Sequence, residues 1–293
     1  MNVLITGVQG LLGHEVAHVC AGAGDTVTGT DVRLPSIPLN ITDPVAIRAA
    51  LVSLRPDWLV NCAAYTNVDG CETDREAAWE LNARAPGHLA RACEELGVKL
   101  LHISTDYVFN GTRETPYTET DEADPVSVYG KTKYAGEVAV REGIEHYLIV
   151  RTQWLFGPHG KNFVSTILNL AKDRDRISVV NDHWCSPTYS KDLARAIRLL
   201  MERGASGIYH VCNRGHATWY DLAKKAIELV DLPTEVVPIP TTEYPLPAPR
   251  PARSILSTKR FVEATGKLMP AWQISLGHYI KEYLFEYRKT GLV

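Results

Sequence analysis

The chain has 293 residues, 45% of them apolar and 22% charged, with a formal net charge of −3 at pH 7 and an isoelectric point near 6.4. That length and composition can bury the core of one large domain or of two ordinary ones, and the absence of a basic surplus argues against a general nucleic-acid or membrane-surface binder. The six cysteines form no CxxC pair, so neither a zinc site nor a disulfide framework is predicted.

The N-terminal sequence MNVLITG reads directly as a first strand, without the charged and apolar regions of a signal peptide. No apolar stretch of the sequence is long enough to cross a bilayer. We therefore expect a cytoplasmic protein with neither a membrane nor a nucleic-acid partner.

The first half of the chain alternates short apolar runs with longer amphipathic segments, the pattern of βαβ units whose helices cover both faces of a parallel sheet. The sequence predicts strands at Val3–Thr6, Thr26–Thr30, Trp58–Asn61, Lys99–Ser104 and Tyr147–Arg151. It predicts helices between them at Leu11–Ala21, Pro44–Leu54, Arg75–Leu96 and Val128–Glu142. The expected fold is α/β, with a doubly wound parallel sheet of the Rossmann type.

The second half is less regular. We expect helices at Phe163–Ala171, Lys191–Arg203 and Ser275–Arg288, a strand at Gly207–Val211, an irregular stretch at Asn181–Ser190, and a passage from Pro233 to Pro251 too rich in proline for regular structure. Residues 1–151, with 191–211 returning, are predicted to form the sheet domain. Residues 152–190 and 212–293 are predicted to form a smaller C-terminal, substrate-binding lobe.

A glycine-rich turn joins the first strand to the first helix. Gly7, Gly10 and Gly13 have the spacing GxxGxxG, which permits a tight turn, a close approach of the backbone to a pyrophosphate, and close packing of helix on strand. The second strand is followed by Asp31, whose carboxylate can accept hydrogen bonds from the ribose of NAD. Arg33 can instead bind the 2′-phosphate of NADP, so the sequence leaves NADPH and NADH open.

A tyrosine and a lysine supply the groups that reduction of a ketone needs. Tyr129 and Lys133 lie one helical turn apart, where the ammonium can favour the tyrosinate and reach the ribose of the nicotinamide. Thr105, at the end of the fourth strand, can bind the substrate oxygen. Tyr220 and Lys224 have the same spacing, but they lie on an amphipathic segment far from the glycine turn, and we interpret them as packing or surface residues.

With these residues in place, the chain resembles the extended short-chain dehydrogenases/reductases, and most closely the dTDP-4-dehydrorhamnose reductase family. The resemblance covers nearly the whole length and is carried by ITGVQGLLG, VNCAAYTNVDGCE, LNARAPGHLA, HISTDYVFNGT, ETDEADPVSVYGKTKYAGE, VRTQWLFG and RPARSIL. It implies reduction of the C4 keto group of dTDP-4-dehydro-L-rhamnose to dTDP-L-rhamnose with NADPH or NADH, in the biosynthesis of nucleotide sugars and cell-surface polysaccharides.

The resemblance also implies a role for each matching residue. Tyr129 is the proton donor, Lys133 its partner, and Thr105 the hydroxyl that binds the carbonyl oxygen. The implied cofactor-binding residues are Gly7, Gly10, Leu11, Leu12, Gly13, Asp31, Arg33, Asn40, Ala63, Ala64, Tyr65, Tyr129 and Lys133, and the implied substrate-binding residues are Thr105, Asp106, Trp154 and Arg250.

The chain departs from the family pattern at a few positions. Asn40 stands where relatives usually carry an aspartate, and His183-Trp184-Cys185 replaces the expected residues before Ser186. Some relatives hold magnesium at a carboxylate-built dimer contact. Glu15 matches one such position, but no convincing equivalents of the others are present, so we predict no catalytic metal and leave a homodimer open.

Other functions remain open at this point. A 4,6-dehydratase would need a glutamate after Thr105-Asp106, but Tyr107 stands there, which favours simple reduction over a dehydratase or a 4-epimerase. A non-catalytic protein, similar to the regulatory subunit of methionine adenosyltransferase, would not need the pair formed by Tyr129 and Lys133. A fold alone does not separate these functions.

Overall fold

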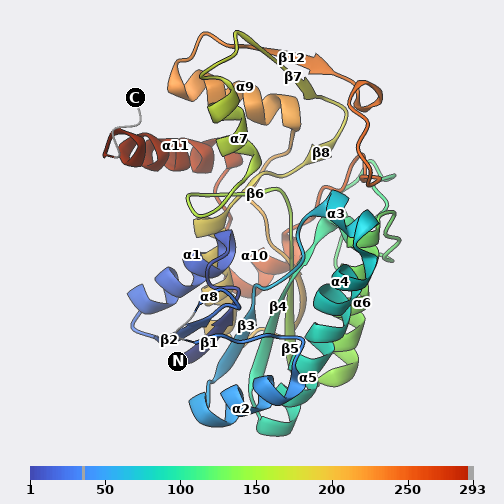
Figure 1. Ribbon diagram of the computed structural model, residues 1–293, viewed down its shortest axis with the longest axis vertical. Helices are drawn as coiled ribbons and strands as arrows, with labels where there is room; N and C mark the ends of the chain where they lie inside the picture. Colours follow the sequence, from blue (N-terminus) through green and yellow to red (C-terminus); the bar gives the residue numbers. More distant parts are fainter. Residues whose placement is uncertain (35–36, 290–293) are drawn as a thin grey trace.

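A six-stranded parallel sheet forms the centre of the larger part of the molecule (Figure 1). The computed structural model describes residues 1–34 and 37–289, so residues 290–293, which the sequence assigns to the smaller lobe, lie outside the described residues. The strand order is β10-β5-β4-β3-β1-β2. The strands are β1 (Asn2–Thr6), β2 (Thr26–Thr30), β3 (Trp58–Asn61), β4 (Lys99–Thr105), β5 (Tyr147–Thr152) and β10 (Gly207–His210), which confirms each predicted strand to within a residue at either end.

The winding of the chain reverses at β1, which pairs with β2 on one side and with β3 on the other. Val3 lies opposite Val27 in one pairing and opposite Trp58 in the other. In open parallel sheets, ligands bind at the carboxyl ends of the strands beside such a reversal. The fold therefore places a binding site where β1 and β3 end.

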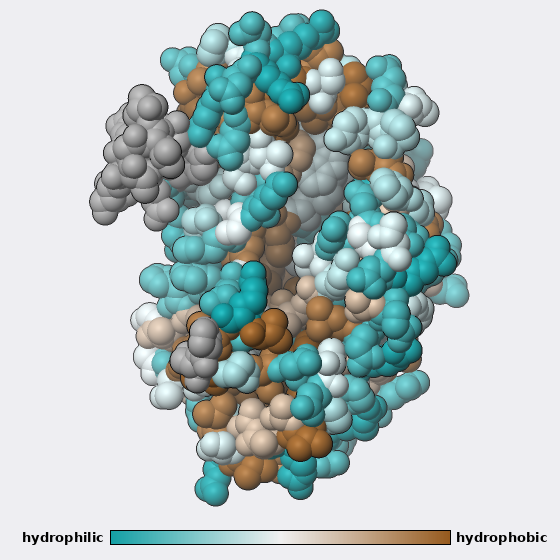
Figure 2. Space-filling view, viewed as in Figure 1, coloured by the Kyte–Doolittle hydropathy of each residue, from teal (hydrophilic) through white to brown (hydrophobic). Residues whose placement is uncertain are grey.

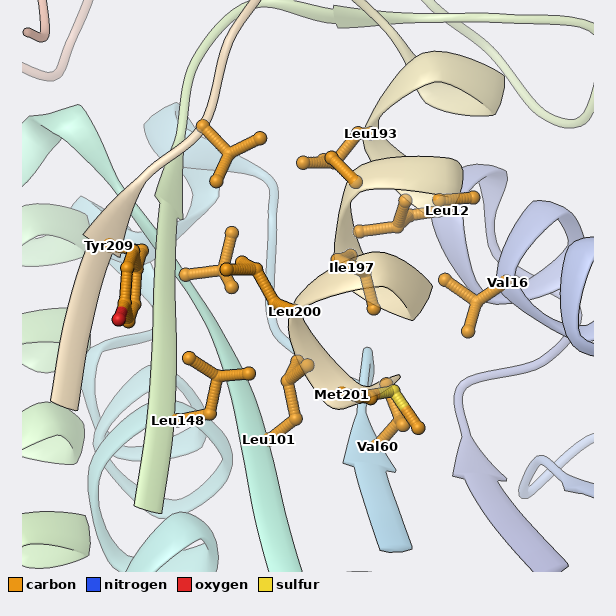
Figure 3. Packing of buried hydrophobic residues seen from close by; sticks show 14 of the residues in the cluster. Leu12, Val16, Val60, Leu101, Leu148, Leu193, Ile197, Leu200, Met201 and Tyr209 are labelled. Carbon is orange, nitrogen blue, oxygen red and sulfur yellow. The ribbon is translucent and has the colours of Figure 1, made fainter. Parts of the chain in front are cut away.

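Helices cover both faces of the sheet, so the inner strands β1, β3 and β5 are almost wholly buried. Residues of β1 alternate between the two layers: Val3 and Ile5 pack with α1 (Leu11–Gly22) and α8 (Ser190–Glu202), as Figure 3 shows for their neighbours, whereas Leu4 faces the opposite layer. That opposite layer contains α2 (Pro44–Leu54), α5 (Ala85–Leu96) and α6 (Val128–Gly143). A further helix, α10 (Lys259–Thr265), packs against β10 and α8 although it comes from the segment assigned to the lobe.

The helix predicted from Arg75 to Leu96 is confirmed, but it contains a π-helical turn that the sequence did not reveal. It consists of α4 (Arg75–Trp79), the π-helical turn η1 (Glu80–Arg84) and α5, with right-handed helical backbone angles at both junctions. A short helix that the sequence also did not reveal, α3 (Val68–Thr73), precedes it. Pro86 lacks the N–H that would bond the carbonyl of Asn82. That carbonyl lies so close to Gly136 of α6 that any side chain there would overlap it.

The smaller lobe stands above the sheet in Figure 1 and is built around three helices. These are α7 (Phe163–Leu170), α9 (Trp219–Val230) and α11 (Trp272–Lys289), accompanied by three short strand pairs and the turn η3 (Thr241–Glu243). The pairs are β6 (Leu155–Phe156) with β9 (Thr188–Tyr189), β8 (Trp184–Cys185) with β11 (Ala217–Thr218), and β7 (Arg176–Val180) with β12 (Glu235–Ile239). A second turn, η2 (Asp106–Val108), follows β4 in the larger part.

Two expectations for this region are therefore corrected. The stretch 181–190 is not wholly irregular, because it contains β8 and β9. The proline-rich passage contains β12, in which Pro238 lies opposite Val179 of β7. A sheet of two strands leaves an open edge, where a residue without an N–H costs no ladder hydrogen bond.

Within the described residues, no helix is both long and apolar enough to span a membrane.

Candidate active site

One cavity of about 790 Å³ collects almost all of the predicted site residues. It lies at the carboxyl ends of the strands, below the smaller lobe, on the face that is hollowed between the two parts in Figure 2. Of the predicted residues, only Tyr65 does not line it; its backbone is held instead by the side-chain amide of Asn82, at 2.8 and 3.0 Å. The residues predicted to bind the cofactor and those predicted to bind the substrate therefore line the same cavity, apart from Tyr65.

The glycine turn has the geometry that its spacing predicts. Gly7 has a φ of 69°, and a Cβ there would come within 2.8 Å of the backbone nitrogen of Ala63. A Cβ on Gly13 would overlap the carbonyl of Gly7, whereas one on Gly10 would lie 3.1 Å from that carbonyl and inside the cavity lining. Gly7 and Gly13 thus serve the turn and its packing, and Gly10 keeps the cavity open.

The first turn of α1 leaves its N–H groups without a side-chain cap. Asp43, Asn67, Ser127, Asn162 and Thr218 cap other helices with their side chains, but the residue before α1 is Gly10, which cannot. No acidic side chain occupies that first turn. Uncapped N–H groups at the positive end of a helix bind a pyrophosphate, so these residues fit a dinucleotide.

At the end of the cavity that is predicted to hold the adenosine ribose, the carboxylate of Asp31 contacts Arg33. Arg33 donates to Oδ1 of Asp31 from its backbone nitrogen at 3.1 Å and from Nε at 3.2 Å. Burial raises the pKa of Asp31, but the hydrogen bonds from Arg33 outweigh it and the net pKa is lowered. Asn40 also lines this end, and its Oδ1 accepts from Thr42.

Tyr129, Lys133 and Thr105 meet in the middle of the cavity. Burial raises the pKa of Tyr129 above its ordinary value, and a hydrogen bond with Thr105 offsets part of that rise. A phenol with a raised pKa keeps its proton at neutral pH and can donate it. The ring packs edge-on against Tyr107, with 5.5 Å between the centroids.

The amine of Lys133 contacts two groups of β4. Its Nζ donates to the carbonyl of Ile103 at 2.7 Å and lies 3.4 Å from Nε2 of His102. Burial lowers the pKa of Lys133 to about 8.

Asp106 lines the cavity but is almost wholly buried, with 1% of its surface accessible. Oδ1 accepts from the hydroxyl of Thr105 at 3.1 Å, and Oδ2 accepts from Cys185 at 3.1 Å and from Ser254. Burial raises its pKa to about 6, although these three donors lower it. Cys185, one of the departures from the family pattern, thus joins the small lobe to the residue beside Thr105.

The lobe side of the cavity is aromatic. Trp154 stacks on Trp219 with 3.4 Å between ring centroids and an angle of 11° between planes. Trp154 has a φ of 43°, a conformation that bulky residues rarely adopt. Arg250 also lines the cavity, and its guanidinium is held by Asp69 of α3 at 2.8 Å.

Several lining residues were not predicted from the sequence. Some lie at or directly after the carboxyl ends of β3, β4 and β5, a position that predicts a place in the binding site. Those from the lobe have no neighbouring motif in the sequence that predicts a place in the site. The additional residues are Val32, Leu39, Ile41, Cys62, Thr66, Val68, Leu81, Ile103, Ser104, Tyr107, Thr152, Gln153, Leu155, Lys161 and Trp219.

Near the start of α1, Glu15 lies with two histidines in an arrangement that could hold a metal ion. Among the described residues, His14, Glu15 and His159 bring ligand atoms within 4.8 Å of one another. Glu15 is buried, which raises its pKa. Neither carboxylate oxygen has a hydrogen-bond partner among the described residues, although Oε1 lies 3.5 Å from Nε2 of His159. Imidazole ligands suit zinc and similar ions better than magnesium. That no metal takes part in catalysis stays a prediction.

Comparison with known proteins finds relatives that match almost the whole chain. The family model described as the RmlD substrate binding domain matches residues 1–285. The chain is 39% identical to the spore coat polysaccharide biosynthesis protein SpsK of Bacillus subtilis, over 96% of this chain and 97% of that protein. It is 37% identical to the dTDP-4-dehydrorhamnose reductase of Salmonella typhimurium, over 96% and 98%. The crystal structure of a dTDP-4-dehydrorhamnose reductase from Bacillus anthracis in complex with NADP superposes with a TM-score of 0.92 at 38% identity, covering 96% of this chain and 100% of that one.

Proposed function

We infer that this chain, which belongs to the family of the RmlD substrate binding domain, is an NAD(P)H-dependent reductase that converts dTDP-4-dehydro-L-rhamnose to dTDP-L-rhamnose. One observation carries the inference: Thr105, Tyr129 and Lys133 line the same cavity as the uncapped glycine turn. A proton donor and a dinucleotide site in one cavity are what reduction of a ketone requires.

The site residues divide the work as follows. The bound nicotinamide cofactor supplies a hydride to C4 of the sugar. Tyr129 donates its proton to the carbonyl oxygen, and Thr105 holds that oxygen in place. The N–H groups after Gly10 bind the pyrophosphate, and Asp31 with Arg33 binds the adenosine ribose.

The substrate end of the cavity has the chemistry for a nucleotide sugar. Among the described residues, Thr152 Oγ1 is a buried polar atom of the lining that has no hydrogen-bond partner. Buried polar groups are normally satisfied, so this hydroxyl is suited to a hydroxyl group of the ligand. Trp154 and Trp219 supply the apolar wall, and Arg250 supplies a charge for the nucleotide. Asp106 acts through Thr105 in this proposal, because its oxygens already accept from Thr105, Cys185 and Ser254.

A steady-state assay tests the proposal. The full chain is incubated with dTDP-4-dehydro-L-rhamnose and either NADPH or NADH, and nicotinamide oxidation is followed together with the sugar product by NMR. We expect stoichiometric dTDP-L-rhamnose. The alternatives need a dTDP-hexose with hydroxyl groups at C4 and C6 in a parallel incubation: loss of water from that sugar would indicate a dehydratase, and inversion at C4 without net oxidation an epimerase. Cofactor binding without turnover of either sugar would indicate a regulatory subunit.

Three further points extend the proposal. We propose that residues 1–151 with 191–211 bind the cofactor and that 152–190 and 212–293 bind the sugar, which separate cofactor and nucleotide titrations of variants in each part would test. A homodimer and a cytoplasmic location rest on the resemblance and on the sequence. Light scattering of the purified chain tests the first, and cell fractionation tests the second.

A further inference from the structure

A row of buried polar side chains runs beneath the cavity and ends at Lys133. Thr6 donates to Oδ1 of Asn61 at 2.7 Å, Nδ2 of Asn61 lies 3.0 Å from Nδ1 of His102, and Nε2 of His102 lies 3.4 Å from Nζ of Lys133. These residues come from β1, β3, β4 and α6, and none has more than 2% of its surface exposed. His102 has no part in the mechanism proposed above.

The hydrogen bonds of Asn61 determine where His102 carries its proton. The backbone N–H of Ala63, which can only donate, lies 3.2 Å from Oδ1 of Asn61, so the amide oxygen must face it. The NH₂ group of Asn61 therefore donates to Nδ1 of His102. Burial, and then the charge of Lys133, keep the pKa of His102 well below its ordinary value, so the ring is neutral. A neutral imidazole has a single N–H, which must be on Nε2, facing Lys133.

An N–H directed at Lys133 favours the amine over the ammonium. A neutral amine has a lone pair that can accept from Nε2–H, whereas an ammonium has none. The other groups around Nζ act differently: Cys62 and the carboxylate of Glu137 favour the ammonium, but Glu137 is already bound by Arg151 at 2.7 and 2.8 Å. Tyr129 lies one turn away on the same helix. The position of His102 thus favours loss of a proton from Lys133.

We propose that His102 is a positioning residue of the reductase, whose Nε2–H donates a hydrogen bond to the lone pair of Lys133 after Lys133 has given up a proton. The step rests on the proposed function. Tyr129 transfers its phenolic proton to the oxygen of the reduced sugar and becomes a tyrosinate. The ammonium of Lys133 returns a proton to the tyrosinate, and the resulting amine is held by Nε2–H. One proton from solvent then restores the ammonium.

The first test is the tautomer of His102 itself, which needs no substrate. The full chain labelled with ¹⁵N has ten histidines, and the ring signals of His102 are those lost in His102→Asn. We expect the shift of an unprotonated Nδ1 and a protonated Nε2, unchanged between about pH 6 and pH 9 because the ring does not titrate there. A proton on Nδ1, or titration within that range, would overturn the proposal.

The second test compares two buried histidines. His102→Asn keeps an amide beside Asn61 but removes the N–H that faces Lys133. His210 is a matched control: it is also buried on the sheet, it lies 3.4 Å from a cation on Arg151, and its Nδ1 contacts the carbonyl of Tyr117 at 3.1 Å. His210→Asn makes the same change away from Lys133.

The readout is the alkaline limb of kcat/KM against pH. Removing the N–H stabilises the ammonium of Lys133. His102→Asn should therefore move the midpoint of the alkaline limb to higher pH by about half a pH unit to one unit, with kcat several-fold lower. His210→Asn should leave the midpoint in place. A purely structural His102 would lower the melting temperature without moving the limb, which would refute the proposal. If the wild type reduces no sugar, the proposed function fails, while the tautomer still decides the geometry of His102.

Discussion

The thiol of Cys185 donates a hydrogen bond of 3.1 Å to the buried carboxylate of Asp106. Cys185 lies on β8 of the small lobe, and Asp106 directly follows β4 of the large sheet. Ser254, from a distant loop, donates to the same carboxylate oxygen. The two parts of the molecule are therefore joined by a buried acid next to Thr105.

This junction makes stability depend on pH. The pKa of Asp106 is raised from 3.8 to about 6, chiefly by burial, so the folded state binds this proton more tightly than the unfolded state does. Its contribution to stability is complete below the ordinary pKa and is lost as the pH rises through about 6. Asp106→Asn removes the titration. The free energy of unfolding of the wild type minus that of the variant should fall by on the order of 3 kcal/mol between roughly pH 4 and pH 7.

Guanidinium unfolding of both proteins across that pH range measures the difference. Asp31→Asn is a control of opposite sign, because the pKa of Asp31 is lowered and its contribution is lost as the pH falls. Parallel curves for the wild type and Asp106→Asn would show that Asp106 does not titrate in this range.

Tyr129→Phe should remove the proton donor and leave cofactor binding nearly intact, since the ring still packs against Tyr107. Turnover should fall by roughly two to four orders of magnitude, the range of general acid catalysis. Tyr220→Phe is the matched control: that ring lies on α9 beneath Lys224, with Nζ 5.7 Å from its centroid, and the change should be almost silent. Near-normal turnover in Tyr129→Phe would refute the assigned proton donor.

Gly10→Val should abolish cofactor binding in a folded protein, because the side chain would occupy the space where the backbone meets the pyrophosphate. Calorimetric titration with NADPH and NADH measures the loss. Gly22→Val, at the other end of α1, is the control, since a Cβ there has no neighbour within 4 Å. Unchanged affinity in Gly10→Val would mean that Gly10 serves the turn alone.

The ion pair of Asp31 and Arg33 should set the choice of nicotinamide. The wild type should use both cofactors with no more than a modest preference, because the carboxylate repels a 2′-phosphate and the guanidinium attracts it. Asp31→Ala should raise the relative efficiency with NADPH. Arg33→Ala should lower it and leave NADH nearly unaffected, as kcat/KM for both cofactors would show. An unchanged NADPH value in Arg33→Ala would make Arg33 a solvated loop residue.

Local features of the chain were enough to predict much of the fold and most of the cavity lining. The strands that end at Thr6, Asn61 and Thr152 are short apolar runs, and the turn at Gly7 needs residues without a Cβ. Such signals depend on neighbours within one element, so they are legible in the sequence. The carboxyl ends of parallel strands meet at one edge of a sheet, which predicts that Thr105 lies near Gly10.

The sequence by itself therefore determined the α/β class, the glycine turn and the spacing of Tyr129 and Lys133. Only the tertiary structure decided the π-helical turn before Pro86, the pairing of β7 with β12, and the approach of Cys185 and Ser254 to Asp106. The physical reason is range. Each of these features requires contact between segments far apart in the chain, and the free energy of such a contact depends on packing and burial that no local pattern contains.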